Sequence, residues 1–201
     1  DARAGRASRV DGGTSRPLLP RDMAVLVREH REAAAVRHAL GACGVPAVSA
    51  GRGSLFDTPQ ARTLLALLLA LASPGDERRL RAALATPLFG FDAPGLCALE
   101  DDGEALRRWQ DDVMRWRLRW EQHGPQAMLA EVIATQAPRL LAMADGEREV
   151  ACLLQLAELL QEARASAFDT RGLGPRGQID WLQDAIVHAD GGDETQWPRL
   201  E

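Results

Sequence analysis

The segment between residues 104 and 122 carries the side chains best suited to bind a nucleic acid. Arginine pairs bidentately with phosphate, and the indole ring of tryptophan stacks on bases. Trp109, Val113, Trp116 and Trp120 repeat at the spacing of one helix face, and the arginines lie largely off that face. These arginines are Arg107, Arg108, Arg115, Arg117 and Arg119. The alternative interpretation is a tryptophan stripe packed in a core beside a solvated basic face.

A second candidate is Arg28, which directly follows the apolar run Met23–Val27. The run predicts a buried strand, so Arg28 would lie at the C-terminal edge of a sheet. In open α/β sheets ligands bind at that edge, and an arginine there can reach a phosphate group. The alternative is an ordinary surface arginine.

Composition excludes several kinds of catalytic site. The chain contains no lysine, so it has no complete P-loop, no Schiff base and no lysine-assisted nuclease site. Its four histidines and three cysteines are scattered, with no pair at ligand spacing, so no metal site is predicted. A two-metal site needs carboxylates from separate elements, so a run of neighbouring acidic residues is expected to lie in a solvated loop. This run consists of Glu100, Asp101, Asp102 and Glu104.

Length and charge limit the class of protein. The 201 residues, 46% of them apolar, suffice for one or two domains with a buried core. The net charge of −5 gives no bulk attraction to nucleic acid, although an acidic protein can carry a local basic face. No apolar run approaches the roughly 20 residues that span a membrane, and no secretory signal is present. We therefore expect a reduced, cytoplasmic protein with no membrane contact.

The first part of the chain predicts a short piece of an α/β fold. Residues 1–16 are rich in Gly, Ala, Ser and Arg and are expected to form a linker or a disordered end. Met23–Val27 and Val45–Ser49 predict strands on either side of a helix at Glu32–Cys43, in a right-handed βαβ unit. Two strands do not form an independently stable sheet, so this unit is expected to be truncated. Its open edge would favour self-association.

From Thr58 onward the pattern is helical. Thr58 and Pro59 favour the start of a helix, and the leucines between residues 64 and 71 cover all its sides, which predicts a buried helix. A helix is expected to start after the stretch that ends at Pro94, and one helix is expected to stop near Pro138. The other helices are expected at 77–85, 104–122, 126–136, 147–165 and 178–189.

Four segments, in their order and spacing, carry a resemblance to a known family. The stretch 22–40, Asp-Met-Ala-Val-Leu-Val-Arg and the helix after it, resembles helicase motif IV, which opens the second RecA-like subdomain. Ser54–Ala61 resembles the exit from that subdomain into a helical insertion, and Thr86–Gly90 continues the match. Gly146–Ala163 resembles a helix typical of RecB. Together they resemble the UvrD/Rep/RecB group of superfamily-1 DNA helicases, and within it RecB, the beta subunit of exodeoxyribonuclease V.

The resemblance implies an internal segment of such a subunit, from motif IV through the helical insertion and ending before motif V. Residues 17–56 would form a partial RecA-like subdomain (2A), and residues 57–201 the helical insertion (2B). The implied fold class is mainly α, a helical accessory subdomain preceded by a truncated βαβ piece of a RecA-like α/β domain.

The resemblance also implies what the intact parent does. It would use ATP and Mg²⁺ to unwind DNA, carry a nuclease, and act with the other two subunits of the exodeoxyribonuclease V complex in recombinational repair of double-strand breaks. The segment by itself is predicted to be inactive and to hold no cofactor.

Two residues take roles from the resemblance. Arg28 matches the motif IV arginine that approaches the γ-phosphate of ATP, a role it would have only in the intact subunit. Gly90 matches a turn that grips the backbone of duplex DNA, where the start of a helix offers N–H groups to phosphate. Asp92 stands where the family has a small neutral residue and would repel phosphate.

Three functions for the helical part follow from these observations. It is expected to orient duplex DNA or to dock partner subunits. A protein-interaction module with no DNA contact is the alternative, and the acidic C-terminal third favours it. An unrelated helical scaffold would be supported if Met23–Val27 and Val45–Ser49 did not pair in parallel.

Overall fold

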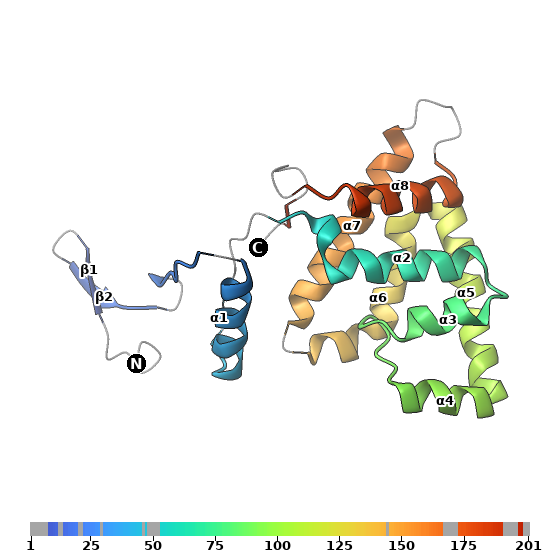
Figure 1. Cartoon of the computed structure of the whole chain (residues 1–201), viewed down its shortest axis with the longest axis horizontal. Coiled ribbons are helices and arrows are strands. Elements are labelled where there is room, and N and C mark those ends of the chain that lie inside the picture. Colours follow the sequence, from blue (N-terminus) through green and yellow to red (C-terminus); the bar gives the residue numbers. More distant parts are fainter. Residues whose placement is uncertain are drawn as a thin grey trace. The chain divides into compact units, whose positions relative to one another are not determined.

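The computed structural model describes residues 8–11, 14–19, 22–28, 30–45, 47, 53–143, 145–166, 173–190 and 197–198. The chain divides into two compact units, Asp1–Gly51 and Arg52–Glu201, and each is described here by itself (Figure 1). Helices dominate the described residues, so the predicted fold class, mainly α, is confirmed.

The first unit contains a hairpin where a linker was predicted. Strand β1 (Ser8–Asp11) pairs antiparallel with β2 (Thr14–Pro17), with Ser8 opposite Pro17 and Asp11 opposite Thr14. The linker prediction is therefore wrong for these residues. In the sequence, a Gly-Gly pair between two short segments is a signal for a hairpin, and this one was overlooked.

The predicted strand at Met23–Val27 is not formed. These residues belong to no strand, and their apolar side chains are exposed, Leu26 to 97%. A strand is stable only when its backbone groups find a partner, and no described segment pairs with this one. Val45 and Ala47 lie outside any strand as well, and the rest of the second predicted strand falls outside the described residues. The described part of the chain thus holds no βαβ sheet and no sheet edge of the kind expected to drive self-association.

The helix expected between these two segments is present. Helix α1 (His30–Ala42) begins two residues earlier than predicted. The Glu32 carboxylate accepts a hydrogen bond from the backbone N–H of Arg28, 2.9 Å away, and so holds the residues before the helix.

The second unit is all helical in its described part. It contains the short 3₁₀ turn η3 (Leu55–Asp57) followed by seven α-helices. These are α2 (Pro59–Ala72), α3 (Glu77–Leu84), α4 (Ala93–Asp101), α5 (Gly103–His123), α6 (Pro125–Leu141), α7 (Gly146–Ser166) and α8 (Pro175–Val187).

Side-chain caps fix where four of these helices begin. Thr58 accepts a hydrogen bond from the N–H of Ala61 at the start of α2, as its sequence position predicts. Asp76, Asp92 and Asp102 cap α3, α4 and α5 in the same way. Each cap satisfies N–H groups that have no partner within the helix, which is worth about 1 kcal/mol.

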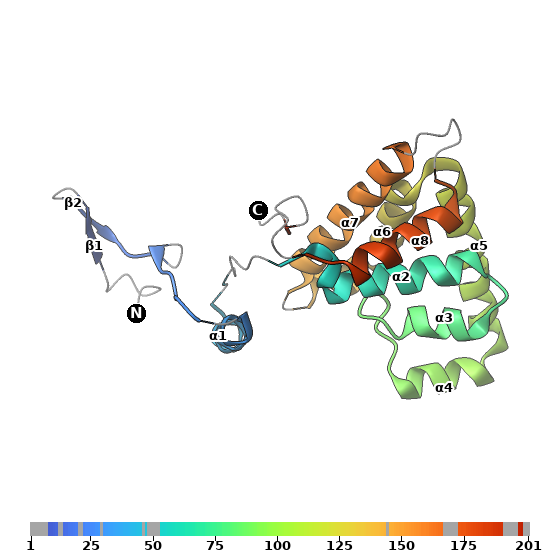
Figure 2. The same cartoon turned by 45° about the horizontal axis from the view of Figure 1, so that its top comes forward.

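Helix α2 forms the centre of this unit. It packs against α3, α5, α7 and α8, and the two views show it running alongside α8 (Figures 1 and 2). Its leucines at 64, 67, 68 and 71 are buried, as expected for a helix with apolar residues on all sides. The core continues through α5, α6 and α7, so these helices hold the side chains on their outer faces in fixed positions.

Helix α6 extends past Pro138, where an end was predicted. It continues to Leu141, although proline removes one hydrogen bond from the helix. Leu140 is fully buried, and Arg139 is bonded to the neighbouring turn, so tertiary contacts hold the last turn in place. The next helix begins close by: a Cβ on Gly146 would overlap the carbonyl group of Leu140.

No helix among the described residues is long and apolar enough to cross a membrane.

Candidate nucleic-acid interface

Four of the predicted arginines lie exposed along α5. Arg108, Arg115 and Arg119 follow one another at spacings of seven and four residues, so they share one side of the helix. Arg107 is exposed next to them. At 1.5 Å per residue, Arg108 and Arg119 are separated by roughly 16 Å along the helix axis, a span that covers more than one phosphate of a nucleic acid strand.

Carboxylates partly neutralise this row. Arg115 contacts Asp112 at 2.7 Å and Glu131 of α6 at 3.0 Å, and Arg119 lies 3.7 Å from Glu131. Partial burial lowers the pKa of Arg115, but its bonds to Glu131 and Asp112 outweigh this effect and raise the pKa above the ordinary value. The Arg115 guanidinium group therefore stays charged, and a phosphate that bound Arg115 or Arg119 would have to displace or share the acids paired with them.

The tryptophan stripe packs in the core. Trp116 and Trp120 are each about 1% exposed, and Val113, which precedes them on the same helix face, is buried as well. Trp109 meets the rings of Phe89 and Phe91 edge to face at centroid distances of 5.4 and 5.6 Å. The core interpretation of this stripe is confirmed, and Trp116 and Trp120 are not available for stacking on bases.

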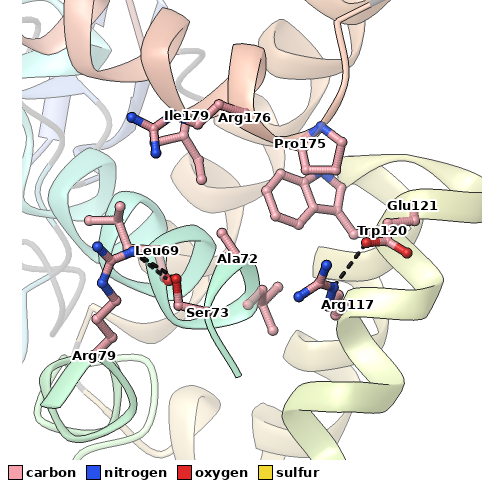
Figure 3. Close-up of a pocket in the computed structure, with 11 residues that line it drawn as sticks. Leu69, Ala72, Ser73, Arg79, Arg117, Trp120, Glu121, Pro175, Arg176 and Ile179 are labelled. Atoms are coloured by element: carbon pink, nitrogen blue, oxygen red, sulfur yellow. Dashed lines mark hydrogen bonds and ion pairs between the residues drawn. The ribbon is translucent and has the colours of Figure 1, made fainter. Parts of the chain in front are cut away.

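Arg117 is half-buried, unlike the other four arginines of α5. It lines a pocket of about 360 Å³ between α2, α5 and α8, to which α3 adds Arg79 (Figure 3). Helix α8 contributes Arg176 to the same pocket. Sequence reasoning missed Arg79 and Arg176, because only the fold places them around the same pocket as Arg117.

The turn at Gly90 is held by Arg139, which the sequence analysis did not single out either. Gly90 adopts φ +71°, a conformation that residues with a side chain rarely take. The Arg139 guanidinium packs against it and donates hydrogen bonds to the carbonyl groups of Pro87 and Leu88. Burial lowers the pKa of Arg139, and the nearby Glu149 carboxylate acts in the opposite direction.

The helix start after this turn is already capped. The Asp92 carboxylate accepts a hydrogen bond from the N–H of Gly95 at 2.8 Å, where a bound phosphate would otherwise take such a bond. Any positive charge that the turn offers to DNA thus comes from Arg139 rather than from free backbone N–H groups.

Arg28 lies in the first unit, exposed and just before α1. The strand that was expected to place it at a sheet edge is absent from the described residues, so its phosphate-binding role is not tested by this geometry. The residues described contain no group of three or more His, Cys, Asp or Glu side chains that could hold a metal ion. Of the acidic run, Asp102 caps α5 and Glu100 pairs with Arg81 of α3.

Comparison with known proteins identifies the family. No protein-family model matches the chain. It is 35% identical to the RecBCD enzyme subunit RecB of Escherichia coli over 200 residues, which is 98% of this chain and 16% of that protein. The chain is homologous to a segment of RecB. RecB of Haemophilus influenzae is 35% identical over 75% of the chain, and RecB of Mycobacterium tuberculosis is 34% identical over 84%.

The match to RecB has two consequences. It confirms the resemblance drawn from the four sequence segments, and it sets aside an unrelated helical scaffold even though the two predicted strands do not form a described sheet. The chain spans about 16% of the length of the E. coli protein, so it matches only a part of that protein.

Proposed function

We propose that this chain is part of an ATP-dependent DNA helicase and nuclease subunit of RecB type that acts in recombinational repair of double-strand breaks in the cytoplasm. The observation that carries the proposal is 35% identity to E. coli RecB over 98% of the chain. The intact subunit would bind ATP and Mg²⁺, with Arg28 approaching the γ-phosphate. The chain has no lysine for a P-loop, so we expect no ATP hydrolysis from it alone.

Within that subunit, we assign the helical unit to orienting duplex DNA or docking the two partner subunits. The row on α5 supports DNA contact, because Arg107, Arg108, Arg115 and Arg119 are exposed on a helix that the core holds rigidly. Arginines at this spacing can contact successive phosphates without reading sequence.

A protein-interaction module with no DNA contact is the second candidate. Met114 and Leu118 lie among the arginines of α5, 54% and 53% exposed, and a phosphate backbone gives such side chains nothing apolar to pack against. The ion pairs of Arg115 and Arg119 with Glu131 also reduce the charge available to DNA.

Fluorescence anisotropy with a duplex that carries a single-stranded tail, measured across a salt series, separates the two candidates. For DNA contact, affinity falls steeply with salt, and Arg115→Ala with Arg119→Ala reduces the salt slope by roughly two. The matched control is Arg62→Ala with Arg78→Ala, which removes the same charge from exposed positions on α2 and α3. No binding at low salt, or equal loss in both double variants, would favour the protein-interaction module.

A further inference from the structure

The pocket beside Arg117 combines an apolar lining with arginines from three helices. Its volume is about 360 Å³, large enough for one or two amino-acid side chains. Leu69 and Ala72 of α2 and Ile179 of α8 line it, and the buried Trp120 closes it on the α5 side (Figure 3).

Each arginine of the pocket is tethered through its Nε atom to a carboxylate of its own helix or helix cap. Arg79 Nε lies 3.2 Å from Asp76, Arg117 Nε lies 2.9 Å from Glu121, and Arg176 Nε lies 3.2 Å from Asp180. The tether of the half-buried Arg117 favours one orientation of its guanidinium plane before a ligand arrives, which reduces the entropy lost on binding, whereas Arg176 is 83% exposed.

The terminal nitrogens of these guanidinium groups remain available. Among the described residues, Arg117 and Arg176 make no hydrogen bond or ion pair beyond the tethers, so both terminal nitrogens of each can donate. Arg79 uses one terminal nitrogen for Ser73 Oγ at 3.0 Å and for the Leu69 carbonyl oxygen, and keeps the other. Guanidinium groups with free terminal N–H pairs match the geometry of a carboxylate.

We propose that this pocket docks a short peptide segment of another protein chain, which inserts one apolar side chain and places a neighbouring carboxylate on Arg117. This inference rests on the partner-docking role in the proposed function and names the chemistry of the partner. The apolar side chain would pack against Leu69, Ala72 and Ile179, and the carboxylate would bind the terminal nitrogens of Arg117, beside Trp120 (Figure 3).

The charges around the pocket favour a single carboxylate over DNA. Three arginines face three tethering carboxylates, so the pocket has little net charge to attract a polyanion. The sugar–phosphate backbone is also convex and polar, and it has no side chain to fill an apolar cavity. A carboxylate that gains several charge-assisted hydrogen bonds needs no long-range field.

A minimal ligand tests the proposal on the whole 201-residue chain. The probe is N-acetyl-leucyl-aspartate amide, which has one apolar side chain and one carboxylate, and its partner is the uncharged leucyl-asparagine analogue. Binding is followed by NMR through the Trp120 indole N–H signal, assigned by its loss in Trp120→Phe. We expect the acidic probe to bind with a dissociation constant of roughly 1 to 10 mM. The uncharged analogue and the Arg117→Gln variant should each weaken binding about tenfold.

Arg62→Gln is the matched control, because Arg62 is exposed, is paired with Asp57 and does not line the pocket; it should leave binding unchanged. Equal binding of the two probes would overturn the proposal in favour of a purely apolar pocket. Displacement of the probe by inorganic phosphate or by the tailed duplex would contradict the proposal and indicate that the pocket binds the phosphates of a nucleic acid. No shift of the indole signal at saturating probe would also overturn it. Arg115 and Arg119 do not line the pocket, so the outcome of the anisotropy experiment does not depend on any of these results. Failure of the peptide proposal can therefore be distinguished from failure of the proposed function.

Discussion

The stability of the helical unit should depend on one buried polar side chain, Gln178 of α8. Its side chain is 2% exposed. Its Oε1 accepts the Trp120 indole N–H at 2.9 Å, and its Nε2 donates to the Leu173 carbonyl oxygen at 2.7 Å. Gln178→Met keeps the length of the side chain but leaves the buried indole N–H without an acceptor. An unsatisfied buried donor costs about 1 to 3 kcal/mol, so the free energy of unfolding should fall by that amount.

Urea unfolding followed by tryptophan fluorescence measures this change, with the slope of the transition unaltered. A double-mutant cycle isolates the hydrogen bond: in a Trp120→Phe background the donor is absent, so Gln178→Met should cost about 1 kcal/mol less than in the parent chain. The reasoning is refuted if Gln178→Met costs under about 0.5 kcal/mol, or if its cost is the same in both backgrounds.

Two further outcomes are expected. Gly146→Ala should lower the free energy of unfolding by about 1 to 3 kcal/mol, because the new methyl group overlaps the backbone at the end of α6, whereas Gly103→Ala, which meets open space, should be neutral or stabilising. Similar urea midpoints for the two variants would contradict this. Burial raises the pKa of the Cys152 thiol, so at about pH 8.5 iodoacetamide should modify the exposed Cys43 and Cys97 and leave Cys152 unmodified until denaturant is added. Detection of three alkylated cysteines in the folded chain by mass spectrometry would contradict the burial of Cys152.

The helices could be predicted because their signals are local. Thr58 before Pro59, and an acidic residue before α3 and α5, mark helix starts by hydrogen bonds that span only a few residues. The all-round leucine pattern of α2 likewise predicted its burial. The end of α6 was missed at Pro138, because distant contacts of Leu140 and Arg139 decide it.

The prediction of strands in the first unit failed for the opposite reason. Met23–Val27 has the composition of a buried strand, but strand formation depends on a partner elsewhere, and the described residues supply none. The site was predicted in part. The arginines of α5 are visible in the sequence, whereas the presence of Arg79, Arg117 and Arg176 around one pocket depends on how three helices pack. Each of these arginines is paired with an acidic residue three or four positions away. The sequence contains these pairs, but it does not indicate that the three arginines line one pocket.

The proposal that the outer face of α5 contacts duplex DNA is tested most directly by tethered hydroxyl-radical cleavage. An iron–EDTA group is attached to a cysteine introduced by Met114→Cys, which lies amid the α5 arginines, or by Val187→Cys, which is 77% exposed near the end of α8. Both variants also carry Cys43→Ser and Cys97→Ser, which remove the two exposed natural cysteines. The buried Cys152 stays unlabelled. Our account predicts cleavage of the duplex from position 114 and none from position 187. Equal cleavage from both positions, or none from position 114, would contradict DNA contact on this face and leave partner docking as the role of the helical unit.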